Sequence, residues 1–102
     1  MQQIDIHKAQ EIIKSNNSTI IDIRQDEDYA SSHVPDAMLV NQSNLDEFIK
    51  NTDKNKPLIC YCYHGISSQQ AADFFEDAGF VNVYSVVGGF EAWRQEYPVV
   101  SS

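Results

Sequence analysis

Two cysteines, Cys60 and Cys62, offer this chain its most direct route to covalent chemistry. Cys62 begins the segment CYHGISS (62–68), which lies between an apolar run, PLICYC (57–62), and a helix-like run, SQQAADFFEDA (68–78). This order predicts a thiol at the carboxyl end of a buried strand, then a polar loop, then a helix. A thiol in that place can be inert packing or a nucleophile, and the residues alone leave both interpretations open.

The loop after Cys62 could favour a thiolate through its backbone. Its amides are committed to neither a sheet nor a helix, and the helix that follows adds the positive end of its dipole, with Ser67 or Ser68 as the expected N-cap. Gly65 permits a backbone conformation that other residues resist. We therefore expect an anionic group on the sulfur to be held by the loop residues Tyr63, His64, Gly65, Ile66, Ser67 and Ser68.

Cys60 is better explained as a structural residue. It lies between Ile59 and Tyr61 inside the apolar run, where a small buried side chain is expected. A disulfide between Cys60 and Cys62 would close a very small, strained ring, so we expect at least one of them to be a free thiol.

A zinc site is a weak alternative for these residues. Cys60, Cys62 and His64 form a C-x-C-x-H string, to which His7 or His33 could add a fourth ligand. Zinc sites typically use two ligand pairs, and no second pair follows. We expect no metal and no cofactor.

Basic residues are missing from the long segment that contains the loop. No Lys or Arg occurs between Lys56 and Arg94, and the sixth residue after Cys62 is Ser68. A cysteine-dependent phosphatase would clamp its phosphate there with a bidentate arginine, so this class of enzyme is disfavoured.

The elements that must position the loop alternate along the chain. Short β-type runs occur at 3–6, 19–23, 37–40, 57–62 and 81–87. Helical spacing of apolar residues occurs at 7–15, 43–51, 68–78 and 88–97, and 26–32 reads as a short helix or turn. Such alternation predicts one α/β domain over 1–102, with a mainly parallel sheet, helices on both faces and a tail that frays over 98–102. Ligands of these sheets gather at the carboxyl ends of the strands, where Cys62 is expected.

The charge and the N-terminus restrict the partners and the compartment. A formal net charge of −8 disfavours nucleic acid and anionic membrane surfaces. No run is long and apolar enough to span a bilayer. The N-terminus, MQQIDIHKAQE, lacks the cationic start and apolar stretch of a secretory signal, so we expect a cytoplasmic protein.

Four segments together resemble the single-domain rhodaneses, and among them the short bacterial thiosulfate sulfurtransferases associated with glycerol metabolism. TIIDIR resembles the family's strand that ends in Asp-x-Arg, and DYASSHVPDA resembles its acidic-aromatic segment with a His. CYHGISS resembles the active-site loop, and VYSVVGGFEAW resembles the strand and helix start near the C-terminus. These segments are residues 19–24, 28–37, 62–68 and 83–93.

The resemblance implies a fold and a role for each motif. The fold would be a three-layer α/β/α domain with a five-stranded, mainly parallel sheet, and Cys62 would be the sulfur-carrying nucleophile. Many rhodaneses have an arginine where this chain has Tyr63, a departure shared by the short sulfurtransferases it most resembles. Asp22, Arg24 and His33 are expected to support the site as braces rather than to do chemistry.

The implied reaction is transfer of the outer sulfur of thiosulfate through a persulfide on Cys62. The acceptor would be cyanide, a small thiol or a thioredoxin-like dithiol protein, and no metal or organic cofactor is needed. Two alternatives stay open: a persulfide carrier with another donor, and a non-catalytic binding or regulatory module that uses the same fold. An arsenate reductase or phosphatase is disfavoured by the missing loop arginine.

Overall fold

A single parallel sheet forms the centre of the molecule. The computed structural model describes residues 1–15 and 17–101. Within them the strands lie in the order β1-β5-β4-β2-β3, and every neighbouring pair is parallel. This confirms the predicted five-stranded sheet and makes its pairing parallel throughout. The strands are β1 (Gln2–Ile4), β2 (Thr19–Asp22), β3 (Met38–Leu39), β4 (Leu58–Tyr61) and β5 (Val83–Val86).

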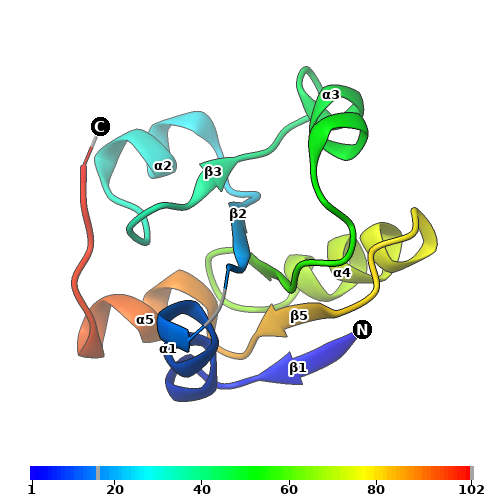
Figure 1. Ribbon diagram of the computed structural model, residues 1–102. Helices are drawn as coiled ribbons and strands as arrows, with labels where there is room; N and C mark the ends of the chain where they lie inside the picture. The colour runs from blue at the N-terminus through cyan, green and yellow to red at the C-terminus, as the bar shows by residue number, and fades with distance from the viewer. Residues whose placement is uncertain (16, 102) are drawn as a thin grey trace.

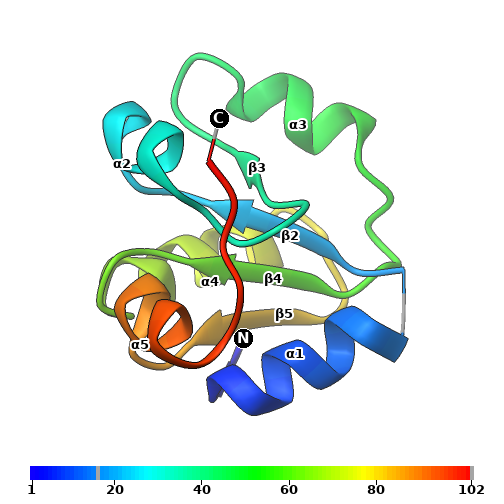
Figure 2. The ribbon, with the colours of Figure 1, turned by 90° about the vertical axis from the view of Figure 1, so that its left-hand side faces the viewer.

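Helices cover both faces of the sheet and give the three predicted layers. α1 and α5 pack on one face, and α3 and α4 pack on the other (Figures 1 and 2). α2 lies beside the end of β2 and buries none of its residues. The helices are α1 (Ile6–Ser15), α2 (Asp26–Ser31), α3 (Leu45–Asn51), α4 (Ser67–Asp77) and α5 (Gly89–Glu96).

β4 is the central strand that carries the cysteines. Its four residues are all buried, because the sheet is covered on both sides. Successive side chains of a strand point to opposite faces. Ile59 and Tyr61 join the core beneath α1 and α5, whereas Leu58 and Cys60 join the core beneath α3 and α4.

The first strand is shorter than its apolar pattern predicted. β1 ends at Ile4, and Ile6, which was expected to close the strand, already begins α1. The reason is Asp5, whose carboxylate accepts a hydrogen bond of 2.8 Å from the Lys8 amide. This side-chain contact satisfies a free donor of the first helical turn and fixes the start of α1.

The buried face of α4 also differs from the predicted one. The spacing of Ala71, Phe74, Phe75 and Ala78 predicted the apolar face, but the buried residues are Ser68, Ala72 and Phe75, and Phe74 is exposed. Compared with the predicted orientation, α4 is turned about its axis so that the polar side chain of Ser68 faces the interior. The reason for this rotation lies in the contacts that Ser68 makes with the Cys62 loop.

The C-terminal tail contacts the body of the domain. It runs across the front of Figure 2, where Val100 forms an antiparallel bridge with His33. Each of these two residues donates its amide to the carbonyl of the other, at 2.8 and 2.9 Å. The tail, which was expected to fray over 98–102, is therefore paired with the body at Val100; residue 102 lies outside the described residues.

Candidate active site: the Cys62 loop

Cys62 lies directly after β4, at the carboxyl end of the central strand. The loop that it opens runs to Ile66, and α4 begins at Ser67. Only 6% of Cys62 is exposed, whereas 76% of Ile66 is exposed. The loop thus curls over the thiol and turns its apolar tip toward solvent.

Hydrogen-bond donors converge on the sulfur. The amides of Gly65 and Ser68 donate to Cys62 Sγ over 3.1 and 3.3 Å, and Ser68 Oγ lies 3.4 Å from the same sulfur. Gly65 has φ 88°, in the left-handed region that favours glycine, which aims its N–H inward. The sulfur therefore sits in a cradle suited to negative charge.

The hydrogen bonds to the sulfur lower the pKa of the Cys62 thiol. Burial raises the pKa of this thiol, but the Ser68 hydroxyl and the amides of Ser68, Gly65 and His64 outweigh burial and hold the pKa below its ordinary value. A lowered pKa supplies the thiolate, which is the nucleophilic form of cysteine.

Cys60 has the opposite environment. Its side chain is fully buried, and burial raises the pKa of the Cys60 thiol well above its ordinary value. Both cysteines are free thiols. Only Cys62 has the surroundings of a reactive cysteine, and Cys60 has those of the structural residue that was predicted.

The predicted cap of α4 was wrong. The N-cap residue is Ile66, with no side-chain capping bond, and Ser67 and Ser68 are the first helical residues. Ser68 uses its hydroxyl on Cys62 and on Ser85 instead of on the backbone. Gln69 completes the support of the loop by donating from Nε2 to the Gly65 carbonyl at 2.9 Å.

The first residues of α5 hold the Cys62 loop in place through backbone hydrogen bonds. The amides of Phe90 and Glu91 donate to the carbonyls of Cys62 and Tyr63 over 2.9 and 3.0 Å. With those carbonyls turned toward α5, the loop can present its N–H groups to the sulfur. Gly89 permits this approach, because a Cβ at that position would lie 2.5 Å from the Cys62 carbonyl oxygen.

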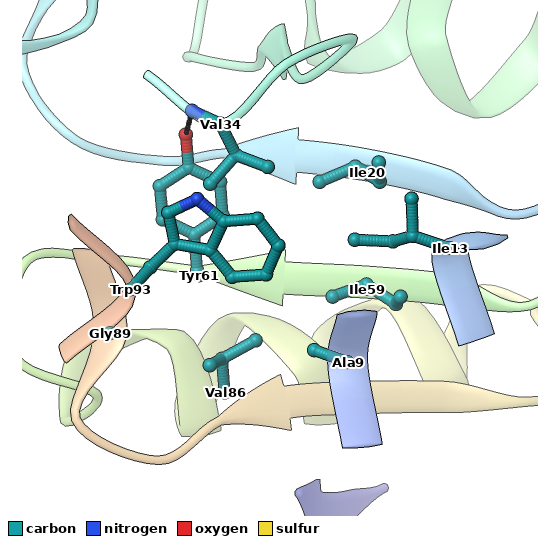
Figure 3. A pocket seen from close by; sticks show the side chains of 9 residues that line it. All are labelled: Ala9, Ile13, Ile20, Val34, Ile59, Tyr61, Val86, Gly89 and Trp93. Carbon is teal, nitrogen blue, oxygen red and sulfur yellow. Dashed lines mark hydrogen bonds between the residues drawn. The ribbon is translucent and has the colours of Figure 1, made fainter. Parts of the chain in front are cut away.

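Asp22 and Arg24 form a buried ion pair at the end of β2. Arg24 Nη2 lies 2.8 Å from Asp22 Oδ2, and the Tyr61 hydroxyl donates to the same oxygen at 2.6 Å. Tyr61 also accepts the Val34 amide, as Figure 3 shows. Arg24 lies over the Phe90 ring, with Cζ 4.0 Å from its centroid. The pair therefore ties β2, β4 and α5 together and has the contacts of a brace.

His33 is placed as a support as well. Its Nδ1 lies 2.8 Å from the Tyr29 carbonyl oxygen, and its ring stacks on Tyr29 at 3.8 Å between centroids. Its backbone pairs with Val100. These contacts fix the turn after α2, and no described contact joins His33 to the Cys62 sulfur.

Ser85 on β5 is a site residue that the sequence reasoning missed. Its hydroxyl oxygen lies 2.7 Å from Ser68 Oγ. A signal was available, because Ser85 is the one polar residue in the apolar strand core VYSV. A buried hydroxyl needs a partner, and a partner search would have led to the loop.

Two other features of the described residues do not form a ligand site. Across residues 1–15 and 17–101, no group of three or more His, Cys, Asp or Glu side chains could hold a metal ion. The hollow in Figure 3, lined by apolar side chains such as Trp93 and Ile13, has about 10 Å³ of usable volume. That is about the smallest space that holds one water molecule, so the hollow is a packing gap. In the same described ranges, no helix is long and apolar enough to cross a membrane.

The sheet and the loop together define an α/β domain with a cysteine-centred anion cradle at the end of its central strand. Comparison with known proteins identifies the family to which this domain belongs. Residues 5–96 match the family described as the rhodanese-like domain. The chain belongs to the rhodanese-like domain family.

Named relatives and a solved structure agree with this assignment. A protein of Coxiella burnetii named thiosulfate sulfurtransferase GlpE is 39% identical over 97 residues, covering 95% of this chain and 91% of the relative. One of the same name from Pseudomonas syringae pv. syringae is 41% identical over 86 residues, covering 84% and 81%. A rhodanese-related protein from Thermoplasma volcanium superposes with a TM-score of 0.84 at 27% identity, covering 100% of both chains.

Proposed function

We propose that this protein is a thiosulfate sulfurtransferase that works through a persulfide on Cys62. The observation that carries the proposal is the converged donor set on the Cys62 sulfur, which lowers the pKa of the thiol despite its burial. The relatives named thiosulfate sulfurtransferase support the choice of donor.

The reaction is a double displacement. The Cys62 thiolate attacks the outer sulfur of thiosulfate, a new S–S bond forms, and sulfite leaves with the electron pair of the broken S–S bond. The enzyme is left as an anionic persulfide, so charge and atoms balance. An acceptor nucleophile then attacks the outer persulfide sulfur and takes it, and the Cys62 thiolate returns. The same amides that hold the thiolate stabilise the persulfide anion.

The acceptor in this proposal is a nucleophile that can take one sulfur atom. Cyanide serves as the assay acceptor, and a small thiol or a thioredoxin-like dithiol protein would serve in a cell. The cytoplasm suits the cycle, because its reducing pool keeps both thiols free. Tyr63 occupies the position where many family members have an arginine, so thiosulfate would be bound by N–H groups and hydroxyls rather than by a loop cation.

Steady-state kinetics test the two-step mechanism. With thiosulfate and cyanide varied together, a covalent intermediate predicts parallel double-reciprocal lines and release of sulfite before acceptor is added. Intersecting lines, with no sulfite released until acceptor is present, would rule out the double displacement. No turnover with any donor would favour the non-catalytic module.

Gly89→Ala should impair transfer, because the added Cβ must push the Cys62 and Tyr63 carbonyls away from α5. A displacement of about 1 Å in a reacting group can cost on the order of 100-fold, so we expect kcat/KM to fall by about 10- to 100-fold. Gly79→Ala is the matched control. It places alanine at a positive φ of 110°, but its Cβ meets only the Lys54 side chain, at 3.4 Å or more. Equal kcat/KM in the two variants would show that the close backbone contacts between α5 and the Cys62 loop do not affect sulfur transfer.

A further inference from the structure

Ser85 lies at the end of a buried row of three polar side chains. Its hydroxyl is next to Ser68 Oγ at 2.7 Å, and Ser68 Oγ is next to Cys62 Sγ at 3.4 Å. Ser85 is 1% exposed and Ser68 is fully buried, so water does not replace these contacts. Among residues 1–15 and 17–101, the bond to Ser68 is the only side-chain hydrogen bond described for Ser85.

The number of protons in this row depends on the charge of the sulfur. The row contains two contacts, one between sulfur and Ser68 and one between Ser68 and Ser85. When the thiol is neutral, the row holds three protons, one each on the thiol and the two hydroxyls, but only two hydrogen bonds can form. One proton therefore has no acceptor within the row. With a thiolate, Ser85 donates to Ser68, Ser68 donates to the sulfur, and both protons are used. An unpaired buried donor is costly, so the row favours the thiolate.

We propose that Ser85 is a positioning residue, whose hydroxyl donates to Ser68 Oγ and thereby directs the Ser68 proton at the Cys62 sulfur. Ser85 has no described hydrogen bond to the sulfur, so it acts through Ser68. This inference rests on the proposed role of Cys62 as the nucleophile. It extends the cradle from the loop to β5, the strand beside β4 in the sheet.

Charged and titratable groups near the loop also influence the Cys62 thiolate, so the test variants must leave the charges of these groups unchanged. They belong to the elements packed around the Cys62 loop, and none is changed in the Ser85 variants. These groups are Asp22 and Arg24 after β2, Cys60 on β4, His64 in the loop, and Glu91 and Arg94 on α5.

The test is the pH dependence of Cys62 alkylation by iodoacetamide, whose rate rises as the thiolate forms. Ser85→Ala removes the hydroxyl and should move the midpoint up by roughly 0.5 to 1 pH unit, as expected for one hydrogen bond. Ser85→Thr keeps the hydroxyl and should keep the midpoint. Cys60→Ala is the matched control, because Cys60 pairs with Ser85 across β4 and β5 but is outside the row.

Coupling to Ser68 separates positioning from a general loosening of the core. In a Ser68→Ala background, Ser85→Ala should add no further shift, because its route to the sulfur is gone. If Ser85→Ala does not fold, Ser85→Val is compared with Ser85→Thr instead. Valine and threonine have the same shape, but only threonine carries a hydroxyl.

An unshifted midpoint in a folded variant without the hydroxyl would overturn the proposal, as would an undiminished shift in the Ser68→Ala background. Alkylation needs no sulfur donor. A protein that shows these shifts but forms no persulfide would therefore refute the proposed function and leave the role of Ser85 toward the thiolate standing.

Discussion

We expect Cys62→Ser to abolish sulfur transfer, with a loss on the order of 10³-fold or more, as is typical when a covalent nucleophile is removed. The serine hydroxyl fits the cradle, but it ionises far less readily than a thiol and forms no persulfide. Thiocyanate production from thiosulfate and cyanide measures the effect directly. The variant should fold normally, because the cradle amides can bind a hydroxyl oxygen.

Cys60→Ser is the matched control for this experiment. Cys60 is fully buried beneath α4, and burial keeps its thiol protonated. Transfer per folded molecule should therefore stay within a few-fold of wild type, although the buried hydroxyl lowers stability. Comparable loss in both variants would mean that the two thiols act as a pair and that Cys62 is not the sole nucleophile.

Asp22→Ala should destabilise the domain by about 3–5 kcal/mol, the usual cost of breaking a buried ion pair from one side. Asp22 is fully buried, and its removal leaves the Arg24 charge without its counter-ion and the Tyr61 hydroxyl without its acceptor. A domain of this size has a free energy of unfolding of only about 5–15 kcal/mol, so the variant should be close to unfolding. Urea denaturation measures the change.

Asp46→Ala serves as the comparison for Asp22→Ala. Asp46 is exposed in the first turn of α3, where a substitution usually changes stability by at most about 0.5 kcal/mol. If Asp22→Ala lost no more stability than Asp46→Ala, the ion pair would not brace the end of β2. The brace would then have to be sought in the packing of Arg24 on Phe90.

The order of elements could be predicted because the apolar runs are short, separate and of different period. The apolar run containing Leu58 and Cys60 predicted a strand covered on both faces, and the structure buries every residue of β4. The loop after Cys62 followed from that strand. In β4 and the loop that follows it, the local apolar pattern agrees with the tertiary packing. The position of the thiol could therefore be predicted from the sequence.

The details that set the chemistry could not be predicted, because they depend on contacts between distant segments. Ser68 has the local properties of a helix cap, yet Cys62 and Ser85 provide better partners for its hydroxyl. The same contacts explain why α4 buries Ser68 and leaves Phe74 exposed. Tyr61 likewise reads as an apolar strand residue, and only the folded sheet brings its hydroxyl to Asp22.

Intact mass after treatment with thiosulfate, in the absence of any acceptor, tests the central claim most directly. The wild-type protein should gain the mass of one sulfur atom, Cys62→Ser should gain none, and Cys60→Ser should gain one. Addition of cyanide should remove the extra sulfur. A wild-type protein that stays at its original mass while it turns over thiosulfate, or an equal gain in Cys62→Ser, would contradict a persulfide on Cys62.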